Sequence, residues 1–356
     1  MAIRGEDKMN RKVTALLAAV MVITMTSCSS NPAHTKEETE ETETTTEETE
    51  ATTTTTEETS EATIKTEETT TSATTEEAAI SESVDEEVDP FFYETSEPVI
   101  TNEEDGIMYV DFYRDDLRMS AKIYLPDGEG PFTTVVLATG LRASCDQYTI
   151  IAEQLASDNI ACVLFDFTGG PSGTSNSDGD QLDMCFTSEV KDLNAVLDGV
   201  MTLDITDTDN VFLFGHSFGG VVSTAVAATR EDEIRGLILM EPAYQLKDIV
   251  TMFLPANAEI PEYVEYPFYL GRAFIEDEIE YDIYEYIPEY HGNVIMFMGT
   301  EGDALGLIGP QYFEEAQELF PNSELVVVEG ANHEFDGDAG LEMYAQSLAF
   351  IEANIV

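Results

Sequence analysis

The chain has 356 residues and a formal net charge of −57, from 72 acidic and 15 basic side chains. Such a surface repels phosphate backbones, which argues against nucleic acid as a partner, and it does not attract anionic substrates. About twenty of the acidic residues lie between residues 31 and 90, so the rest of the chain is also strongly acidic. We attribute this charge to solubility or to adaptation to a salty medium.

The N-terminus is typical of a secretory signal. Arg11-Lys12 precedes an uncharged apolar run, Val13 to Met25, which ends in small residues before a cysteine, Cys28. The run of about 13 residues is short for a membrane span, which needs ~20. Residues 1–28 are therefore predicted to be a signal peptide, with translation starting at Met1 or Met9.

The Thr26-Ser27-Cys28 sequence resembles the lipobox of bacterial lipoproteins, although Met25 stands where that motif usually has Leu. The resemblance implies that Cys28 is lipidated and becomes the new N-terminus. The protein would then be extracytoplasmic and would contact the cell membrane only through its lipid anchor. An ordinary cleaved signal and an uncleaved anchor are the alternatives.

Residues 29–89 are predicted to be a disordered stalk. They consist almost entirely of Thr, Glu, Ser and Ala, as in Thr52–Glu58. With few aliphatic residues to bury and with like charges that repel one another, this segment has no basis for a packed core. We interpret it as a spacer between a lipid anchor and a folded domain.

Residues 90–356 have the pattern of one α/β domain. Short apolar strands alternate with stretches in which apolar residues recur every three or four positions, which favours a mostly parallel eight-stranded sheet flanked by helices. The strands are expected at Ile107–Tyr113, Met119–Leu125, Thr133–Ala138, Ile160–Asp166, Asn210–Phe214, Gly236–Met240, Val294–Met298 and Glu324–Val328. Helices are expected near 147–158, 187–202, 218–229, 311–319 and 339–353. The first two strands have no helix between them, so they are expected to pair as an antiparallel hairpin.

The strongest chemical motif is Gly215-His216-Ser217-Phe218-Gly219, between an apolar strand and a helix of small residues. This G-x-S-x-G turn exposes a nucleophilic serine at a helix N-terminus, and glycines two residues before and after it avoid clashes. Ser217 is therefore the predicted nucleophile. His216 is interpreted as a neighbour that packs or forms a hydrogen bond, since adjacent side chains on so tight a turn point apart.

A serine nucleophile needs a base and an acid. His333 lies in a polar loop after the last predicted strand, and is the predicted base. This loop is expected at the same edge of the sheet as the Ser217 turn, which we call the elbow. Asp303 follows the preceding strand, and the order Ser217, Asp303, His333 is that of α/β-hydrolases. Glu301 and Asp336 are the alternative acids.

The oxyanion hole is predicted to use the backbone N–H groups of Leu141 and Phe218. Leu141 follows the third predicted strand, in Ala138-Thr139-Gly140-Leu141, and Phe218 follows the nucleophile. No cluster of His, Cys and Asp has ligand spacing, so we expect neither a metal nor an organic cofactor. Three cysteines lie in the domain; Cys162 is expected in the core, and no Cys145–Cys185 disulfide is predicted.

From about Met108 to the end, the chain resembles the bacterial acyl-esterase and serine-aminopeptidase-like branch of the α/β-hydrolases, which includes cinnamoyl (feruloyl) esterases. The segments that carry the resemblance are Phe165–Gly170, Ser177–Gly179, Gly215–Gly220, Gly299–Asp303 and Gly330–His333. One departure is Thr139-Gly140, where this branch usually has His-Gly, so the side chain that braces the oxyanion loop differs.

The resemblance implies an inserted lid at about Tyr244–Tyr290, rich in tyrosine and phenylalanine. Its rings either line an acyl or aryl pocket or simply pack the lid on the body. The implied activity is hydrolysis of carboxylic esters through an acyl-enzyme. The expected substrate is a small-molecule or polysaccharide-linked ester with a small or aromatic (hydroxycinnamoyl) acyl group. A serine peptidase of the same fold and a surface-tethered binding protein on a hydrolase scaffold are the alternatives.

Overall fold

The computed structural model describes residues 89–171, 175–254, 258–265, 269–302 and 309–356. Cys28, the predicted stalk and Asp303 lie outside these residues. No helix within the described ranges is both long and apolar enough to cross a membrane.

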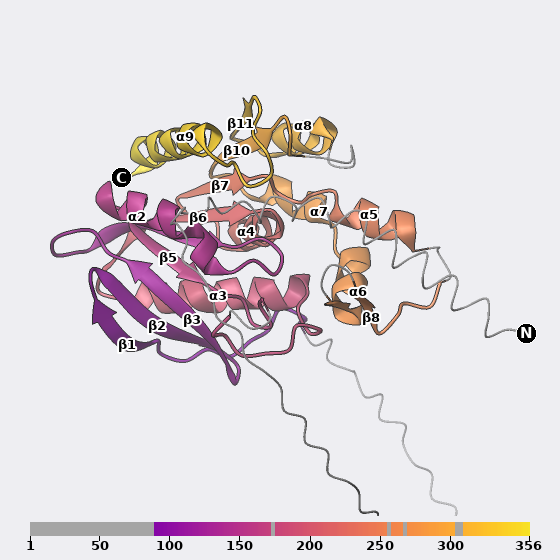
Figure 1. Ribbon diagram of the computed structural model, residues 1–356, viewed down its shortest axis with the longest axis horizontal. Helices are drawn as coiled ribbons and strands as arrows, with labels where there is room; N and C mark the ends of the chain where they lie inside the picture. Colours follow the sequence, from indigo (N-terminus) through magenta and orange to yellow (C-terminus); the bar gives the residue numbers. More distant parts are fainter. Residues whose placement is uncertain (1–88, 172–174, 255–257, 266–268, 303–308) are drawn as a thin grey trace, which may run out of the picture. The chain divides into compact units, whose positions relative to one another are not determined.

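A nine-stranded sheet forms the centre of the domain, with strand order β1-β2-β3-β5-β4-β6-β7-β10-β11 (Figure 1). The strands are β1 (Val99–Glu104), β2 (Ile107–Arg114), β3 (Leu117–Tyr124), β4 (Phe132–Ala138), β5 (Ala161–Phe165), β6 (Thr206–His216), β7 (Gly236–Met240), β10 (Asn293–Gly299) and β11 (Ser323–Val328). The pairs from β5 through β4, β6, β7 and β10 to β11 are parallel, whereas β1, β2 and β3 pair antiparallel, with β3 antiparallel to β5. The mostly parallel sheet and its antiparallel hairpin are confirmed.

Helices cover both faces of the sheet, as the alternation of apolar segments predicts. The helices outside the insertion are η2 (Cys145–Tyr148), α2 (Thr149–Ser157), α3 (Phe186–Thr202), α4 (Phe218–Thr229), α8 (Pro310–Leu319) and α9 (Asp338–Asn354). Successive strand residues such as Val135 and Val136 face opposite sides, and both are fully buried. One core forms between the sheet, α3, α4 and α8, and the other between the sheet, α2 and α9.

The sheet has one strand more than predicted. All six residues of β1 are exposed, so the segment carries no alternation of apolar and polar residues that marks a strand in sequence. It is held by antiparallel pairing with β2, whose own alternation is regular, with every second residue buried.

An insertion between β7 and β10 forms the lid that the resemblance implies. Its elements are α5 (Leu246–Phe253), β8 (Tyr263–Glu265), β9 (Tyr269–Gly271), α6 (Arg272–Glu280), α7 (Ile283–Tyr286) and η3 (Ile287–Glu289). α6 contacts α3, while α7 and η3 contact α4, so the lid rests on the helix layer that contains the elbow helix. Figure 1 shows α5, α6, α7 and β8 grouped at one end of the sheet.

Candidate active site

Ser217 stands in a strained turn between β6 and α4. Its φ is 54° and its ψ is −119°, a left-handed backbone conformation that costs free energy in any residue with a side chain. A Cβ at Gly215 would lie 2.6 Å from the carbonyl oxygen of Gly219, so glycine is required where the turn closes on itself. Ser217 is the N-cap of α4, and its side chain is partly exposed at the positive end of that helix. The strand–turn–helix predicted around Ser217 is therefore present.

The register of the parallel strands brings two loops to the elbow. Gly215 pairs with Ala138 at the end of β4, which places the predicted oxyanion loop beside the turn. On the other side, His216 pairs with Met240 at the end of β7, so the residue after Met240 also lies next to Ser217. These loops follow the carboxyl ends of parallel strands, where sites in open α/β sheets form.

His333 is buried beside the elbow. Its backbone carbonyl lies 3.0 Å from the Nε2 atom of His216, and the centroids of the two imidazole rings are 4.8 Å apart. No hydrogen bond joins Ser217 to His333 within the described ranges. Hydrogen bonds between catalytic groups are often long before substrate binds, so this geometry is compatible with the predicted pair.

A carboxylate that the sequence did not single out faces His333. Glu241, the residue after β7, is buried, and its Oε2 atom lies 3.7 Å from the Nδ1 atom of His333. The Oε1 atom of Glu241 accepts a hydrogen bond from the backbone N–H of Gly299. Nδ1 of His333 is buried without a hydrogen-bond partner in this part of the chain. A charged residue directly after an apolar central strand was the available signal.

The other acids considered from sequence lie elsewhere or are not described. Glu301 is exposed, and its backbone N–H donates to the carbonyl of Ala331. Asp336 is exposed and accepts a hydrogen bond from the Asn332 side chain. Asp303 is outside the described residues. Its neighbour Gly302 is in place, and a Cβ there would lie 2.7 Å from Oε1 of Glu241, so the Glu241 carboxylate packs against the start of the predicted acid loop.

The predicted oxyanion donors lie on both sides of the elbow. Phe218 is the first residue of α4, where backbone N–H groups lack a partner within the helix. Leu141 follows Gly140 in a turn closed by a 2.9 Å hydrogen bond from Ala143 N–H to the Gly140 carbonyl. A Cβ at Gly140 would lie 3.3 Å from the Cβ of Ser217, so this turn packs directly against the nucleophile.

Comparisons with known proteins agree with this arrangement. A family model described as serine aminopeptidase, S33, matches residues 129–280. The quorum-quenching protein AidA of Acinetobacter baumannii is 32% identical over 120 residues, which are 33% of this chain and only 38% of that protein.

The similarity to solved structures extends over more than two thirds of the chain. Est1E from Butyrivibrio proteoclasticus, in a complex with ferulic acid, superimposes with a TM-score of 0.60 at 20% identity, covering 68% of this chain and 97% of that one. DcsB, in complex with its substrate analogue, gives 0.55 at 17% identity and covers 74% and 99%. The chain has the α/β-hydrolase fold.

The inserted lid contacts both sides of the elbow. Phe274 of α6 is fully buried and packs on Phe218, with ring centroids 5.4 Å apart. Arg142, next to Leu141, donates to the carbonyl of Tyr269 in β9 at 3.0 Å and to the side chain of Gln181 at 2.6 Å. The oxyanion loop and the helix N-terminus are thus both attached to the insertion.

One lid aromatic clearly packs the insertion onto the body of the domain: Tyr281 contacts Phe186 of α3 with ring centroids 5.3 Å apart. Tyr284 contacts Tyr244 at 6.0 Å, and Tyr263 and Tyr269 contact each other across the β8–β9 pair, so these ring contacts lie within the insertion. Tyr266 and Phe268 lie outside the described residues.

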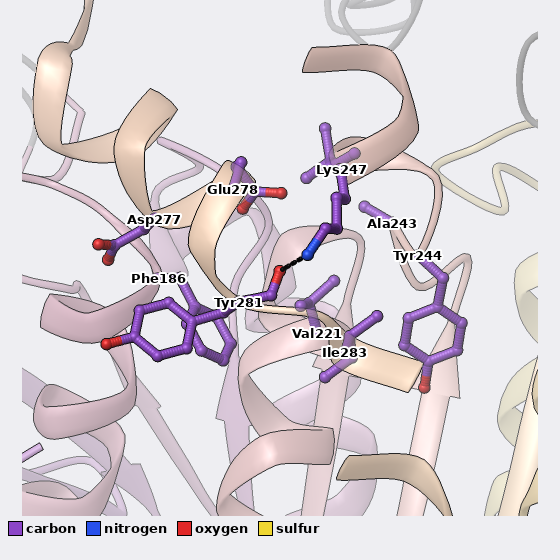
Figure 2. Close-up of a pocket in the computed structure, with 10 residues that line it drawn as sticks. Phe186, Val221, Ala243, Tyr244, Lys247, Asp277, Glu278, Tyr281 and Ile283 are labelled. Atoms are coloured by element: carbon purple, nitrogen blue, oxygen red, sulfur yellow. Dashed lines mark hydrogen bonds between the residues drawn. The ribbon is translucent and has the colours of Figure 1, made fainter. Parts of the chain in front are cut away.

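A small cavity lies beneath the lid, between α3, α4, α5 and α6 (Figure 2). Its volume is about 20 Å³, room for about one water molecule and too small for an acyl group. Lys247 donates to the carbonyl of Tyr281 at 3.0 Å, and the buried Glu278 lies on the cavity wall beside it. Burial, and secondarily the neighbouring Asp277, raises the pKa of Glu278 to about 8.

One group of potential metal ligands occurs in the described part of the chain: His216, His333 and Glu334, whose donor atoms lie within 4.8 Å of one another. Both ring nitrogens of His216 have protein partners, Tyr148 and the His333 carbonyl, so this residue does not offer a free ligand atom. Cys145, Cys162 and Cys185 are buried, with Cys162 in the core as expected.

Proposed function

We propose that this chain is a serine esterase that cleaves carboxylic esters through an acyl-enzyme. The observation that carries the proposal is the strained conformation of Ser217, with φ of 54°, on a turn flanked by the His333 loop and the predicted oxyanion loop. Backbone strain of this kind is retained where the surrounding structure enforces it, and a nucleophile elbow is one such case.

In the proposed reaction, the Ser217 hydroxyl attacks the ester carbonyl carbon while His333 takes its proton. The negative charge that develops on the carbonyl oxygen is stabilised by the N–H groups of Leu141 and Phe218. His333 then gives the proton to the leaving alcohol, which leaves the acyl group on Ser217. A water molecule, deprotonated by His333, releases the acid and restores the serine.

The imidazole of His333 requires a carboxylate at Nδ1 to fix its tautomer and to stabilise the imidazolium. Chain order assigns this role to Asp303, and the geometry of the described residues supports Glu241. Both remain proposals, and we favour Glu241 because its carboxylate lies 3.7 Å from Nδ1 and is buried with it.

For the substrate we propose a small or aromatic acyl ester, either a free small molecule or a polysaccharide-linked ester. The similarity to Est1E, whose structure contains ferulic acid, supports an aromatic acyl group. The matching family model is named for an aminopeptidase, which keeps a peptidase as the second candidate. A binding protein on a hydrolase scaffold is the third, and it would not need a reactive serine.

The test uses the full chain with p-nitrophenyl esters of increasing acyl length, methyl hydroxycinnamates and aminoacyl p-nitroanilides. We expect turnover of the esters, labelling by a fluorophosphonate probe, and the loss of both in Ser217→Ala by at least about three orders of magnitude. Turnover confined to the anilides would favour the peptidase. A folded protein without turnover or labelling would favour the binding protein.

A further inference from the structure

A chain of hydrogen bonds passes behind the nucleophile. The Nδ1 atom of His216 lies 2.5 Å from the hydroxyl of Tyr148, and the His216 Nε2 atom lies 3.0 Å from the carbonyl oxygen of His333. The same Tyr148 hydroxyl accepts a hydrogen bond from the backbone N–H of Gly140 at 3.4 Å. Tyr148, His216, His333 and Gly140 are all buried.

The directions of these hydrogen bonds follow from the chemistry of the groups. Burial, together with the nearby His333, lowers the pKa of His216 well below its ordinary value, so the ring is neutral and carries one N–H. A carbonyl oxygen only accepts, so that N–H is on Nε2 and donates to His333. Nδ1 therefore accepts from the Tyr148 O–H, and the Tyr148 oxygen accepts from Gly140.

This chain joins two parts of the proposed machinery that are far apart in sequence. At one end, Gly140 directly precedes Leu141, the proposed oxyanion donor. At the other end is the backbone of His333, the proposed base, and between them His216 precedes Ser217. Three hydrogen bonds thus link these four residues, and they join positions that are 8, 68 and 117 residues apart in the sequence.

Thr139, in the same loop as Gly140, does not make this cross-link. Its hydroxyl donates within the loop, to the carbonyl of Ala143 at 3.4 Å. Tyr148, at the end of η2, is the side chain that joins this loop to the elbow.

We infer that Tyr148 and His216 are positioning residues, which hold the Leu141 N–H and the His333 ring at fixed places around Ser217. This inference rests on the proposed function. Because an oxyanion donor acts on charge that exists only in the transition state, loss of alignment lowers the rate of the chemical step and leaves initial binding unchanged.

The test compares Tyr148→Phe with the wild type in the full chain, using the kinetics of fluorophosphonate labelling of Ser217. Phosphonylation needs the same nucleophile, base and oxyanion hole but does not depend on knowing the natural substrate. We expect Tyr148→Phe to lower the maximal labelling rate by about 10- to 100-fold, less than the loss of a whole oxyanion donor, with the half-saturating probe concentration changed less than about twofold.

Tyr290→Phe is the matched control. Tyr290 is fully buried and donates to the carbonyl of Ile234 at 3.1 Å, before β7 and β10 begin and so at the opposite edge of the sheet. This change removes a buried tyrosine hydroxyl of the same kind, so it should lower thermal stability to a similar extent while leaving the labelling rate within about twofold of wild type.

The inference is overturned if Tyr148→Phe labels at the wild-type rate, or if both variants lose labelling in proportion to their loss of stability. Absence of labelling in the wild-type protein would instead overturn the proposed function, and the positioning role with it. If the wild-type protein is labelled but turns over no ester, only the esterase proposal fails. The labelling rates of Tyr148→Phe and the wild type would then still decide the role of Tyr148.

Discussion

At the scale of single residues, the role of Glu241 gives a sharp prediction. Replacing its carboxylate in Glu241→Gln keeps the shape but removes the charge, and the new amide can present an N–H to Nδ1 and favour the wrong tautomer of His333. We expect kcat/KM to fall by about three to four orders of magnitude, the range seen when the acid of a serine triad becomes an amide.

Asp303→Asn is the matched variant for that experiment. Gly302, which precedes Asp303 in the sequence, packs against the Glu241 carboxyl. If Glu241 orients His333, Asp303→Asn should retain most of the activity. A large loss of activity in Asp303→Asn, together with an active Glu241→Gln, would instead mean that Asp303 orients His333.

Ser217 and His333 could be predicted from sequence because each occurs in a motif with a fixed relation to a strand. Glu241 could not, because it is one of 72 acidic residues and only the pairing of His216 with Met240 places it beside the elbow. Tyr148 was missed for a similar reason. Its hydroxyl meets His216 across 68 positions, a contact that no local pattern records.

At the scale of elements, the lid helix α6 and the body helix α3 each bury a carboxyl group. Glu278 of α6 and Glu189 of α3 are both buried, and neither oxygen of Glu189 has a hydrogen-bond partner in the described chain. Burial raises the pKa of both carboxyls, and each is raised further by acidic neighbours, Asp277 beside Glu278 and Asp192 beside Glu189. Lys247 acts in the opposite direction on Glu278.

The pKa of Glu278, about 8 in the folded chain, lies above the ordinary value of about 4.3 expected when unfolded. Between these values the folded state holds a proton that the unfolded state has lost. The free energy of unfolding therefore falls as pH rises through this window, by up to about 1.4 kcal/mol per unit, and this group adds no slope below or above it. We expect Glu278→Gln to flatten the dependence of Tm on pH between about 5 and 8.

Glu276→Gln, on the exposed face of the same helix, is the control and should leave the slope as in the wild type. The buried amide in Glu278→Gln lowers stability by the same amount at every pH. The slope of Tm against pH is therefore compared, and not Tm itself. Equal slopes in the wild type and Glu278→Gln would mean that this carboxyl does not carry the proton.

The same residue explains why α6 was not predicted as a helix. Its buried positions are Phe274, Ile275 and Glu278, so the apolar stripe that marks a helix in sequence is interrupted by a carboxyl. Strands such as β7, which are apolar at every position, were predicted to the residue. The sheet and its main helices are thus readable from periodicity, whereas the lid depends on contacts with α3 and α4.

At the scale of the whole molecule, the N-terminal sequence leads to a prediction about where the protein is located. We propose that Cys28 is lipidated and that residues 29–89 space the domain from the membrane. One acyl chain gives only marginal membrane binding, and two or more give stable anchoring. The strong negative charge of the chain would itself oppose contact with an anionic membrane surface, so attachment should depend on the lipid.

This proposal predicts that the full chain, expressed in a bacterial host, incorporates labelled palmitate and sediments with membranes, while Cys28→Ser does neither. High salt should not release the wild-type protein, because the attachment is hydrophobic, and detergent should release it. Cys145→Ser is the control, since that thiol is buried in the domain and should leave labelling and sedimentation unchanged. Membrane attachment that persists in Cys28→Ser would point to an uncleaved apolar anchor at Val13–Met25, and release of both forms into the medium would indicate an ordinary cleaved signal.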